Sequence, residues 1–489
     1  MKEQLVLAID QGTTGTTVLL LDDKMEIRGK GYREIPQSYP APGLVEHDPE
    51  AIWRSVLDAV AEARAQARAG TIAAIGVTNQ RETTVLWERA TGRAVAPAIV
   101  WQDRRTTDRC EVMRKAGLEP TFQNRTGLRL DPYFSGTKIA WLLENVPNLR
   151  AKSEAGAIAF GTVDSFLVWH LSGGKSHITD VSNASRTLLL DLDHLDWNPD
   201  LCRLLDVPMA ILPRICASSG MLATTLGVEG IPDGTPITGM AGDQQAALYG
   251  QGCTSRGDAK CTFGTGSFLL MNVGDKPVLS HHRLLGTVAW QTSQGTTYAL
   301  EGSAFVSGAL VQWLRDGLGI IDSAAEVEPL AASVPDTGGV TIVPALAGLG
   351  APHWRPDARG MICGISRGTT AAHIARAALE AMAMQNVDLV RAMELDADHP
   401  ITTLRVDGGA AKNNLLMQMQ ADLLGADIVR PAMVESTALG AARLAARGLG
   451  LYSAPGKTSD LVVSTFHPHI GPSERDQVVA RWHHALAKA

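Results

Sequence analysis

Cysteine is scarce in this chain of 489 residues, which has six, and no two of them form a Cys-x-x-Cys pair. A zinc site or a thioredoxin-like redox motif built on such a pair is therefore not expected. Scattered thiols are typical of proteins kept in a reducing compartment, so we expect a cytoplasmic location. The paired histidines, at 281–282 and 483–484, have no cysteine or carboxylate cluster at ligand spacing beside them, and we interpret them as surface residues.

Long apolar runs and an excess of positive charge are also missing. No stretch approaches the roughly 20 apolar residues that cross a bilayer, so no membrane span is expected. The net charge of −7 gives no reason to expect a nucleic-acid partner. The first residues lead directly into a strand-like run, so we expect no signal peptide.

The chain does have 45% apolar residues and 48 glycines, which is typical of compact domains with many tight turns. Its length allows roughly two to four domains of about 100–200 residues.

The first motif is a hairpin. Residues 5–9 form an apolar run that ends at Asp10, the Gly-Thr-rich stretch 11–17 follows, and residues 18–21 are apolar again. Backbone N–H groups in such a turn can hold phosphate, although the Gly-Lys-Ser/Thr ending of a Walker A loop is absent. A plain hairpin turn is the alternative interpretation.

A helix over residues 48–69 and a strand over 72–77 come next, and this alternation indicates an α/β fold. Arg81 and Glu82 follow the strand, at the end where α/β sheets bind ligands. From position alone, a solvated turn pair is an equally good interpretation.

Near the middle of the chain, a strand at 236–238 leads to Gly239-Met-Ala-Gly-Asp243-Gln-Gln-Ala-Ala-Leu-Tyr-Gly250. Asp243 stands at a loop-to-helix junction, where an acidic residue is ordinarily a helix N-cap. Capping is the preferred interpretation while the stretch is taken alone.

The order of elements then repeats. A strand ending at Phe263, the turn Gly264-Thr-Gly266 and the apolar run 268–271 repeat the first hairpin, and a helix over 371–398 and a strand over 403–406 follow. The chain is therefore predicted to be a tandem of two related α/β domains, residues 1–249 and 250–489.

Taken together, seven motifs resemble those of the FGGY family of carbohydrate kinases, and within it the glycerol kinases, in the actin-like ATPase superfamily. They are Asp10-Gln-Gly-Thr-Thr, Gly76-Val-Thr-Asn-Gln-Arg-Glu-Thr-Thr, Trp101-Gln, Asp131-Pro-Tyr-Phe-Ser-Gly-Thr-Lys, Ala241-Gly-Asp-Gln-Gln-Ala-Ala-Leu, Phe263-Gly-Thr-Gly and Arg405-Val-Asp-Gly-Gly-Ala. The resemblance implies two tandem actin-like (ribonuclease H-like) ATPase domains that flank a cleft for nucleotide and substrate. It also implies transfer of the ATP γ-phosphoryl group to glycerol, with Mg²⁺, giving sn-glycerol 3-phosphate and ADP.

The resemblance implies a role for each matching residue. Asp243 would be the general base, and Asp10 would hold hydrated Mg²⁺, with Asp243 also near the metal. The glycerol-binding set would be Arg81, Glu82, Trp101, Tyr133, Asp243, Gln244 and Phe268. The nucleotide-binding set would be Thr13, Thr14, Gly15, Thr265, Gly266, Gly308, Gln312, Gly409 and Asn413. Relatives form dimers and tetramers, so a homo-oligomer is expected.

The sequence departs from the family's pattern in three places, and each departure puts one family property in doubt. Thr17 stands where family members often have a basic residue, so one phosphate contact would have to come from elsewhere. No Lys or Arg lies between Arg214 and Arg256, so inhibition by fructose 1,6-bisphosphate through the loop 229–235 is not expected. The same region has no histidine, so activation by histidine phosphorylation is not expected either.

Two other functions remain open at this point. A kinase of the same family could act on a pentulose or another polyol, although the match at Arg81, Glu82 and Tyr133 favours glycerol. A nucleotide-dependent scaffold related to actin would share the cleft and the phosphate turns, but it would not need a polyol-binding set beside a carboxylate.

Overall fold

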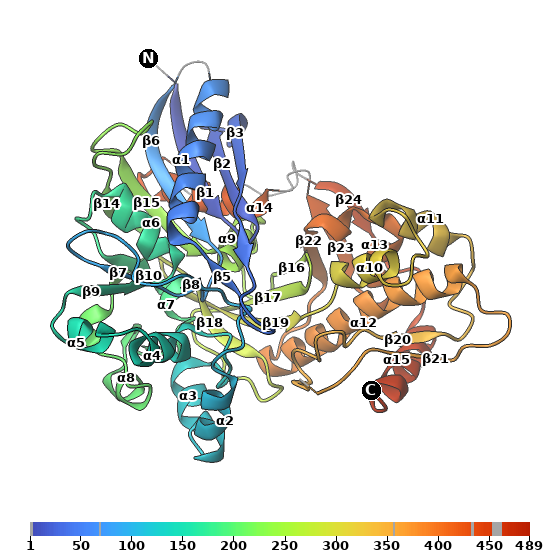
Figure 1. Ribbon diagram of the computed structural model, residues 1–489. Helices are drawn as coiled ribbons and strands as arrows, with labels where there is room; N and C mark the ends of the chain where they lie inside the picture. Colours follow the sequence, from blue (N-terminus) through green and yellow to red (C-terminus); the bar gives the residue numbers. More distant parts are fainter. Residues whose placement is uncertain (1–2, 68–69, 356, 432–434, 452–461) are drawn as a thin grey trace.

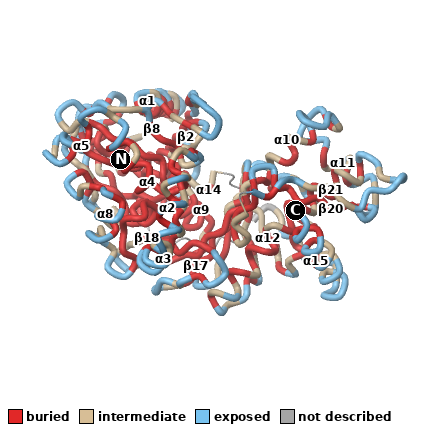
Figure 2. The backbone as a smooth tube through the Cα atoms, turned by 60° about the horizontal axis from the view of Figure 1, so that its bottom comes forward, coloured by how far each residue is buried: buried red, intermediate tan, exposed pale blue. Residues whose placement is uncertain are grey.

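The computed structural model describes residues 3–67, 70–355, 357–431, 435–451 and 462–489. Two large mixed sheets organise it, one in each half of the chain, and they lie side by side in Figure 1. Buried residues gather in the interior of both halves and around α9 and β17 (Figure 2).

The first sheet has six strands in the order β14-β15-β6-β1-β2-β3. β1 pairs antiparallel with β2 and parallel with β6, so the predicted hairpin is confirmed. The strands are β1 (Gln4–Gln11), β2 (Gly15–Leu21), β3 (Ile27–Glu34), β6 (Thr71–Asn79), β14 (Ser219–Thr224) and β15 (Pro236–Gly242).

The second sheet has seven strands in the order β18-β19-β17-β16-β22-β23-β24. β16 pairs antiparallel with β17 and parallel with β22, as β1 does with β2 and β6, so the predicted repetition of elements is confirmed. The strands are β16 (Ala259–Phe263), β17 (Ser267–Gly274), β18 (Leu285–Thr292), β19 (Gly295–Ala304), β22 (Thr403–Asp407), β23 (Asp427–Pro431) and β24 (Val462–Phe466).

Helices cover both sheets. In the first half they are α1 (Pro49–Gln66), α2 (Thr107–Lys115), α3 (Glu119–Thr126), α4 (Ser135–Asn145), α5 (Leu149–Glu154), α6 (Val163–Leu171), α7 (Val181–Ala184), α8 (Pro199–Leu204) and α9 (Asp243–Gly250). In the second half they are α10 (Gly308–Asp316), α11 (Val327–Ala332), α12 (Ala371–Ala397), α13 (Asn414–Leu424), α14 (Ser436–Gly448) and α15 (Pro472–Leu486).

Short strands complete the fold in small sheets. They are β4 (Gln37–Ser38), β5 (Glu46–His47), β7 (Val85–Glu88), β8 (Ala98–Ile99), β9 (Ile158–Gly161), β10 (Ile178–Asp180), β11 (Leu190–Asp191), β12 (Asp196–Trp197), β13 (Arg214–Cys216), β20 (Thr341–Val343) and β21 (Met361–Cys363).

Two predicted helices are present with adjusted ends. α1 begins after Asp48, whose side chain accepts a hydrogen bond from the backbone N–H of Glu50, and Pro49 occupies the first turn. It ends at Gln66, before the predicted end at 69, and residues 68–69 lie outside the described residues. α12 spans residues 371–397, within one residue of the prediction.

Helix α14 belongs to the second half in sequence but packs on the first sheet. Figure 1 places it beside β1 and β2, and it contacts β1, β6, β14 and β15 as well as α9. The approach is backbone to backbone: a Cβ on Gly76 would lie 2.2 Å from the carbonyl oxygen of Ala441, and one on Gly440 would lie 1.8 Å from that of Ala246. Only glycine permits such contact.

Helix α15 is held to α12 through one buried carboxylate. Asp388 accepts hydrogen bonds from Nε2 of His353 (3.1 Å), Nε1 of Trp482 (2.8 Å) and Nε2 of His483 (2.8 Å). These partners hold the pKa of Asp388 at about 2, against the effect of its burial.

Candidate active site

The first Gly-Thr turn (Gly12–Gly15) joins β1 to β2. The backbone N–H of Gly12 donates to the carbonyl oxygen of Gly15 (2.9 Å), which leaves Thr13 and Thr14 at the tip, with Thr14 exposed. Gly15 has a packing reason to be glycine, because a Cβ there would lie 2.6 Å from the carbonyl oxygen of Arg33.

The second Gly-Thr turn (Gly264–Gly266) has the same form. The N–H of Gly264 donates to the carbonyl oxygen of Gly266 (2.9 Å). Helix α10 begins directly on this turn, since the N–H of Gly308 donates to the oxygen of Gly264 (2.9 Å) and that of Ala309 to the oxygen of Thr265 (3.1 Å). Three of the predicted nucleotide residues, Thr265, Gly266 and Gly308, therefore lie together.

The other three predicted nucleotide residues lie farther along the second half. Gln312 is exposed on α10. Gly409 is exposed, and a Cβ there would meet no atom within 4 Å, so open space lies beside it. Asn413 caps α13, where its side chain accepts from the N–H of Leu416 (2.8 Å).

Three aromatic side chains from separate segments meet beside the first turn. The ring of Trp101 lies 5.7 Å from that of Tyr133 and 6.0 Å from that of Phe268, centroid to centroid, both edge-on. The indole N–H of Trp101 donates to Oγ1 of Thr13 (2.9 Å). The predicted alcohol-binding aromatics are thus joined to the predicted phosphate turn.

Asp243 is not the N-cap of its helix, and that interpretation of the sequence is wrong. β15 continues through Gly242, which takes the cap position, and Asp243 is the first residue of α9. Its Oδ1 accepts from the N–H of Gln244 (2.7 Å) and lies 3.1 Å from Nε of Arg81. The side chain is 27% exposed. Burial raises the pKa of Asp243, while Arg81 and Lys260 act to lower it.

Arg81 and Glu82 are not a solvated turn pair. Both are buried in an arginine–glutamate network (Arg81, Glu82, Arg186 and Glu301). Glu301 accepts from both Nη atoms of Arg81 and from Nη2 of Arg186 (2.9 Å), and Nε of Arg186 donates to Oε1 of Glu82 (2.7 Å). Glu82 also has a left-handed backbone, with φ of 59°, which is strained for a side chain of this size.

The sequence motifs contain neither Arg186 nor Glu301. Arg186 follows α7, and Glu301 lies within β19, between Leu300 and Gly302. Burial acts to raise the pKa of Glu301, but Arg186 and Arg81 outweigh it and hold that pKa at about 2. An acidic residue directly after the short apolar run 298–300 was the available signal, because a buried carboxylate needs a paired cation.

Lys260 is a second cation that the motifs miss. Its side chain is fully buried on β16, and Nζ donates to Oε1 of Gln244 and to Oγ1 of Thr262 (2.8 Å). Burial lowers the pKa of Lys260, and Asp407 and Asp243 act to raise it. Gln244, predicted to bind the alcohol, therefore already has its amide oxygen engaged by Lys260.

The carboxylate of Asp10 lies among other negatively charged side chains. Burial, and then the charges of Asp243 and Glu435, raise the pKa of Asp10 well above its usual value. Among the described residues, no three side chains converge as a complete protein cage for a metal ion. Two carboxylates that repel each other, as Asp10 and Asp243 do, are the kind of ligand that suits Mg²⁺, which retains several waters and binds through one or two carboxylates and substrate phosphates.

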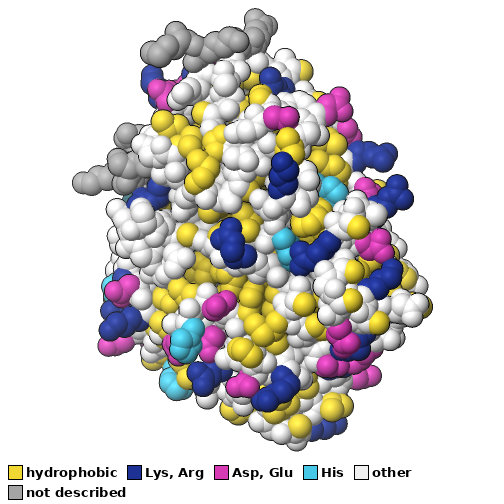
Figure 3. Space-filling model, turned by 90° about the vertical axis from the view of Figure 1, so that its left-hand side faces the viewer, with side chains coloured by type: hydrophobic (Ala, Val, Ile, Leu, Met, Phe, Trp, Pro, Cys, Tyr) yellow, Lys and Arg dark blue, Asp and Glu magenta, His cyan; other side chains and the backbone are white. Residues whose placement is uncertain are grey.

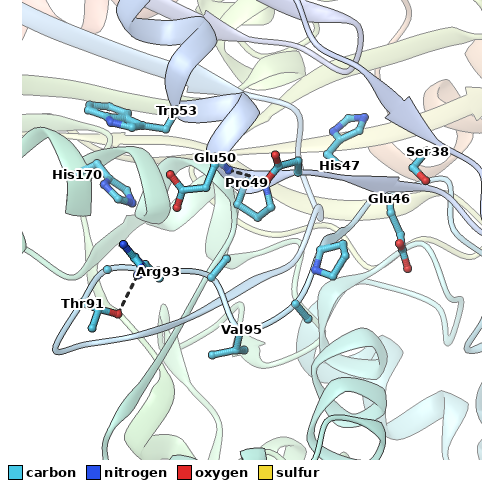
Figure 4. Close-up of a pocket in the computed structure, with 15 residues that line it drawn as sticks. Ser38, Glu46, His47, Pro49, Glu50, Trp53, Thr91, Arg93, Val95 and His170 are labelled. Atoms are coloured by element: carbon cyan, nitrogen blue, oxygen red, sulfur yellow. Dashed lines mark hydrogen bonds between the residues drawn. The ribbon is translucent and has the colours of Figure 1, made fainter.

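A cavity of about 870 Å³ lies elsewhere in the first half and contains none of the predicted site residues. Figure 4 shows Trp53 and His170 on one side of it and Glu46 on the other. The rings of Trp53 and His170 stack at 5.1 Å, and Asp48 in its wall is engaged as the cap of α1. The cavity has no part in the geometry above.

The surface and the helices have two further relevant properties. On the face shown in Figure 3, Lys and Arg side chains are interspersed with Asp and Glu and do not gather in one basic patch. None of the helices in the described ranges combines the length and apolar character that a bilayer crossing needs.

Comparison with known proteins matches both halves of the chain to one family. Residues 5–250 match the N-terminal domain of the FGGY family of carbohydrate kinases, and residues 259–449 match its C-terminal domain. The chain is 55% identical to a glycerol kinase of Alkalilimnicola ehrlichii, over 99% of this chain and 98% of that one. It is 52% identical to a glycerol kinase of Myxococcus xanthus, over the full length of both.

The crystal structure of Plasmodium falciparum glycerol kinase with ADP matches with a TM-score of 0.93 at 34% identity, over 99% of this chain and 98% of that one. The predicted two-domain α/β kinase fold is confirmed by this match.

Proposed function

The chain belongs to the FGGY family of carbohydrate kinases, and from that premise we propose that it phosphorylates glycerol with ATP, giving sn-glycerol 3-phosphate and ADP. The observation that carries the proposal is the hydrogen bond from Trp101 to Thr13. This bond places the three aromatic side chains, Trp101, Tyr133 and Phe268, directly beside a turn suited to phosphate.

Asp243 is the proposed general base. Its carboxylate stands at the start of α9, partly open to solvent and in contact with Arg81, so it can accept the proton of an alcohol as the new phosphorus–oxygen bond forms. Phosphoryl transfer depends mainly on positioning and charge neutralisation. A carboxylate fixed by a helix start and an arginine provides the positioning.

Asp10 and Asp243 are the proposed carboxylates beside Mg²⁺. When bound, Mg²⁺ neutralises charge on the transferring phosphates. The raised pKa of Asp10 supports this assignment, because a nearby cation would relieve the repulsion from Asp243 and Glu435.

The two halves would then divide the substrates. Residues 1–249 would supply the glycerol site apart from Phe268, together with the first Gly-Thr turn and the base. Residues 250–489 would supply the second Gly-Thr turn and the adenine side, with Gly308, Gln312, Gly409 and Asn413. The N–H groups of both turns would hold the phosphates, and Thr13, Thr14, Gly15, Thr265 and Gly266 are the proposed contacts. A homo-oligomer and a cytoplasmic location stay predictions.

Glycerol offers little apolar area, so hydrogen bonds must provide most of the selectivity. Sites of this kind reject analogues that lack a hydroxyl group by about 10⁴–10⁵. Arg81, Glu82, Tyr133 and Gln244 would supply donors and acceptors, and Trp101 with Phe268 would cover the carbon chain. When glycerol binds, its hydroxyl groups would replace some contacts that these side chains make with one another, such as that of Arg81 with Tyr133.

A coupled assay of ADP release with Mg-ATP tests the proposal. Glycerol should give turnover, and xylulose, ribulose and erythritol should give much lower kcat/KM. No glycerol-dependent turnover would refute the proposal, and a higher kcat/KM with a pentulose or erythritol would change the substrate. Filaments formed on addition of ATP without any response to glycerol would favour a scaffold.

A further inference from the structure

Arg81 has five N–H groups, and each of them faces an acceptor within the protein. Both Nη atoms donate to Glu301, Nη1 also reaches Oε1 of Gln245 (3.3 Å) and Nη2 reaches the hydroxyl of Tyr133 (3.3 Å). The remaining N–H, on Nε, faces Oδ1 of Asp243 at 3.1 Å. The guanidinium group is therefore held by its two-pronged pair with Glu301 and presents only its Nε edge to Asp243.

Glu301 comes from the opposite half of the chain. It lies in β19 of the second sheet, whereas Arg81 follows β6 of the first and Arg186 follows α7. All three side chains are at most 2% exposed. A carboxylate that accepts from two arginines in such a dry environment is a rigid anchor, because the pairing is bidentate and charge-assisted.

We propose that Glu301 is a positioning residue for the reaction: it fixes the guanidinium group of Arg81 so that Asp243 remains available to the alcohol. The inference rests on the proposed function above. Without the anchor, the two Nη atoms of Arg81 would be free to turn toward Asp243 and form a two-pronged pair with it. Such a pair would occupy the oxygens that must accept the proton and would weaken Asp243 as a base.

The test is the pair of variants Glu301→Gln and Glu301→Asp, with kcat and the KM values for glycerol and ATP measured for each. In Glu301→Gln, kcat should fall about 10²-fold, as expected when a positioned group is misplaced by about 1 Å. The KM for ATP should stay close to that of the wild type, because the predicted nucleotide residues lie outside the network. In Glu301→Asp, which keeps a carboxylate for Arg81, part of the lost kcat should be recovered.

Asp388→Asn is the matched control, because it also removes a buried carboxylate with several partners but lies on α12, outside the network. It should lower the unfolding temperature and leave kcat unchanged. A kcat of Glu301→Gln equal to that of the wild type, or a loss of kcat that Asp388→Asn shows equally, would overturn the positioning role. If Glu301→Gln does not fold, an unchanged kcat in Glu301→Asp would overturn it. Absence of glycerol turnover in the wild type would instead overturn the proposed function.

Discussion

Replacement of Asp243 by asparagine separates chemistry from folding at the proposed base. The amide keeps the shape of the carboxylate, and its oxygen can still accept from the N–H of Gln244, which lies 2.7 Å from Oδ1 of Asp243 in the wild type. What it loses is the ability to take a proton and the charge facing Arg81. General-base catalysis contributes about 10²–10⁴-fold, so kcat with glycerol should fall by that factor.

We expect the Asp243→Asn change to alter the free energy of unfolding only slightly, and in the stabilising direction at pH 7. Burial raises the pKa of Asp243, so the folded protein penalises the ionised form relative to the unfolded chain. Stability from this group is complete below its unfolded pKa and is lost as pH rises through its folded pKa. A neutral side chain avoids that penalty at pH 7, while Arg81 keeps its pair with Glu301. The free energy of unfolding should therefore change by no more than about 1 kcal/mol.

The assay is coupled ADP release with glycerol and with water as acceptors, alongside thermal unfolding of the same preparations. Asp388→Asn serves as the control for a neutralised aspartate outside the cleft. A variant that retains full kinase activity would refute the role of Asp243. A variant that loses activity together with several kcal/mol of stability would show that the side chain is needed for the fold.

Three further changes probe other parts of the structure. Asp10→Asn should reduce kcat and raise the Mg²⁺ concentration needed for half-maximal ADP release, and an unchanged Mg²⁺ titration would contradict its assignment. Asp388→Asn should cost about 2 kcal/mol at pH 7, since its folded pKa of about 2 lies below the usual 3.8; denaturant titrations should show that the wild type loses this advantage as pH falls from about 4 to 2. Gly440→Ala should destabilise the protein by several kcal/mol, because the new Cβ would lie 1.8 Å from the carbonyl oxygen of Ala246; an unfolding temperature equal to that of the wild type would contradict that contact.

Local patterns predicted the elements that carry the site. The two hairpins, α12 and the order of elements in each half depend on runs of apolar residues and on glycine-rich turns, and the structure confirms them. The family resemblance also named Trp101, Tyr133 and Phe268, which the fold brings together.

The network around Arg81 could not be read in the same way. Glu301 and Arg186 are separated from Arg81 by 220 and 105 positions, and only the tertiary fold brings them to one point. The cap at Asp243 was wrong for a related reason: the glycine-rich stretch before it continues β15, because β6 pairs with it as far as Gly242. Sheet pairing extends a strand beyond the point at which its own composition stops favouring one.

The position of α14 has a consequence for how the chain is made. Its residues, 436–448, cover β6 and β15 at glycines whose backbone touches the helix directly. A ribosome must therefore release nearly the whole chain before the first sheet acquires this cover, although the strands themselves emerge hundreds of residues earlier. During synthesis the first sheet would therefore stay without its covering helix α14, in contrast to domains that complete their folding as they emerge. A fragment that ends at residue 249 would retain the proposed base but lack the helix that closes the sheet behind it.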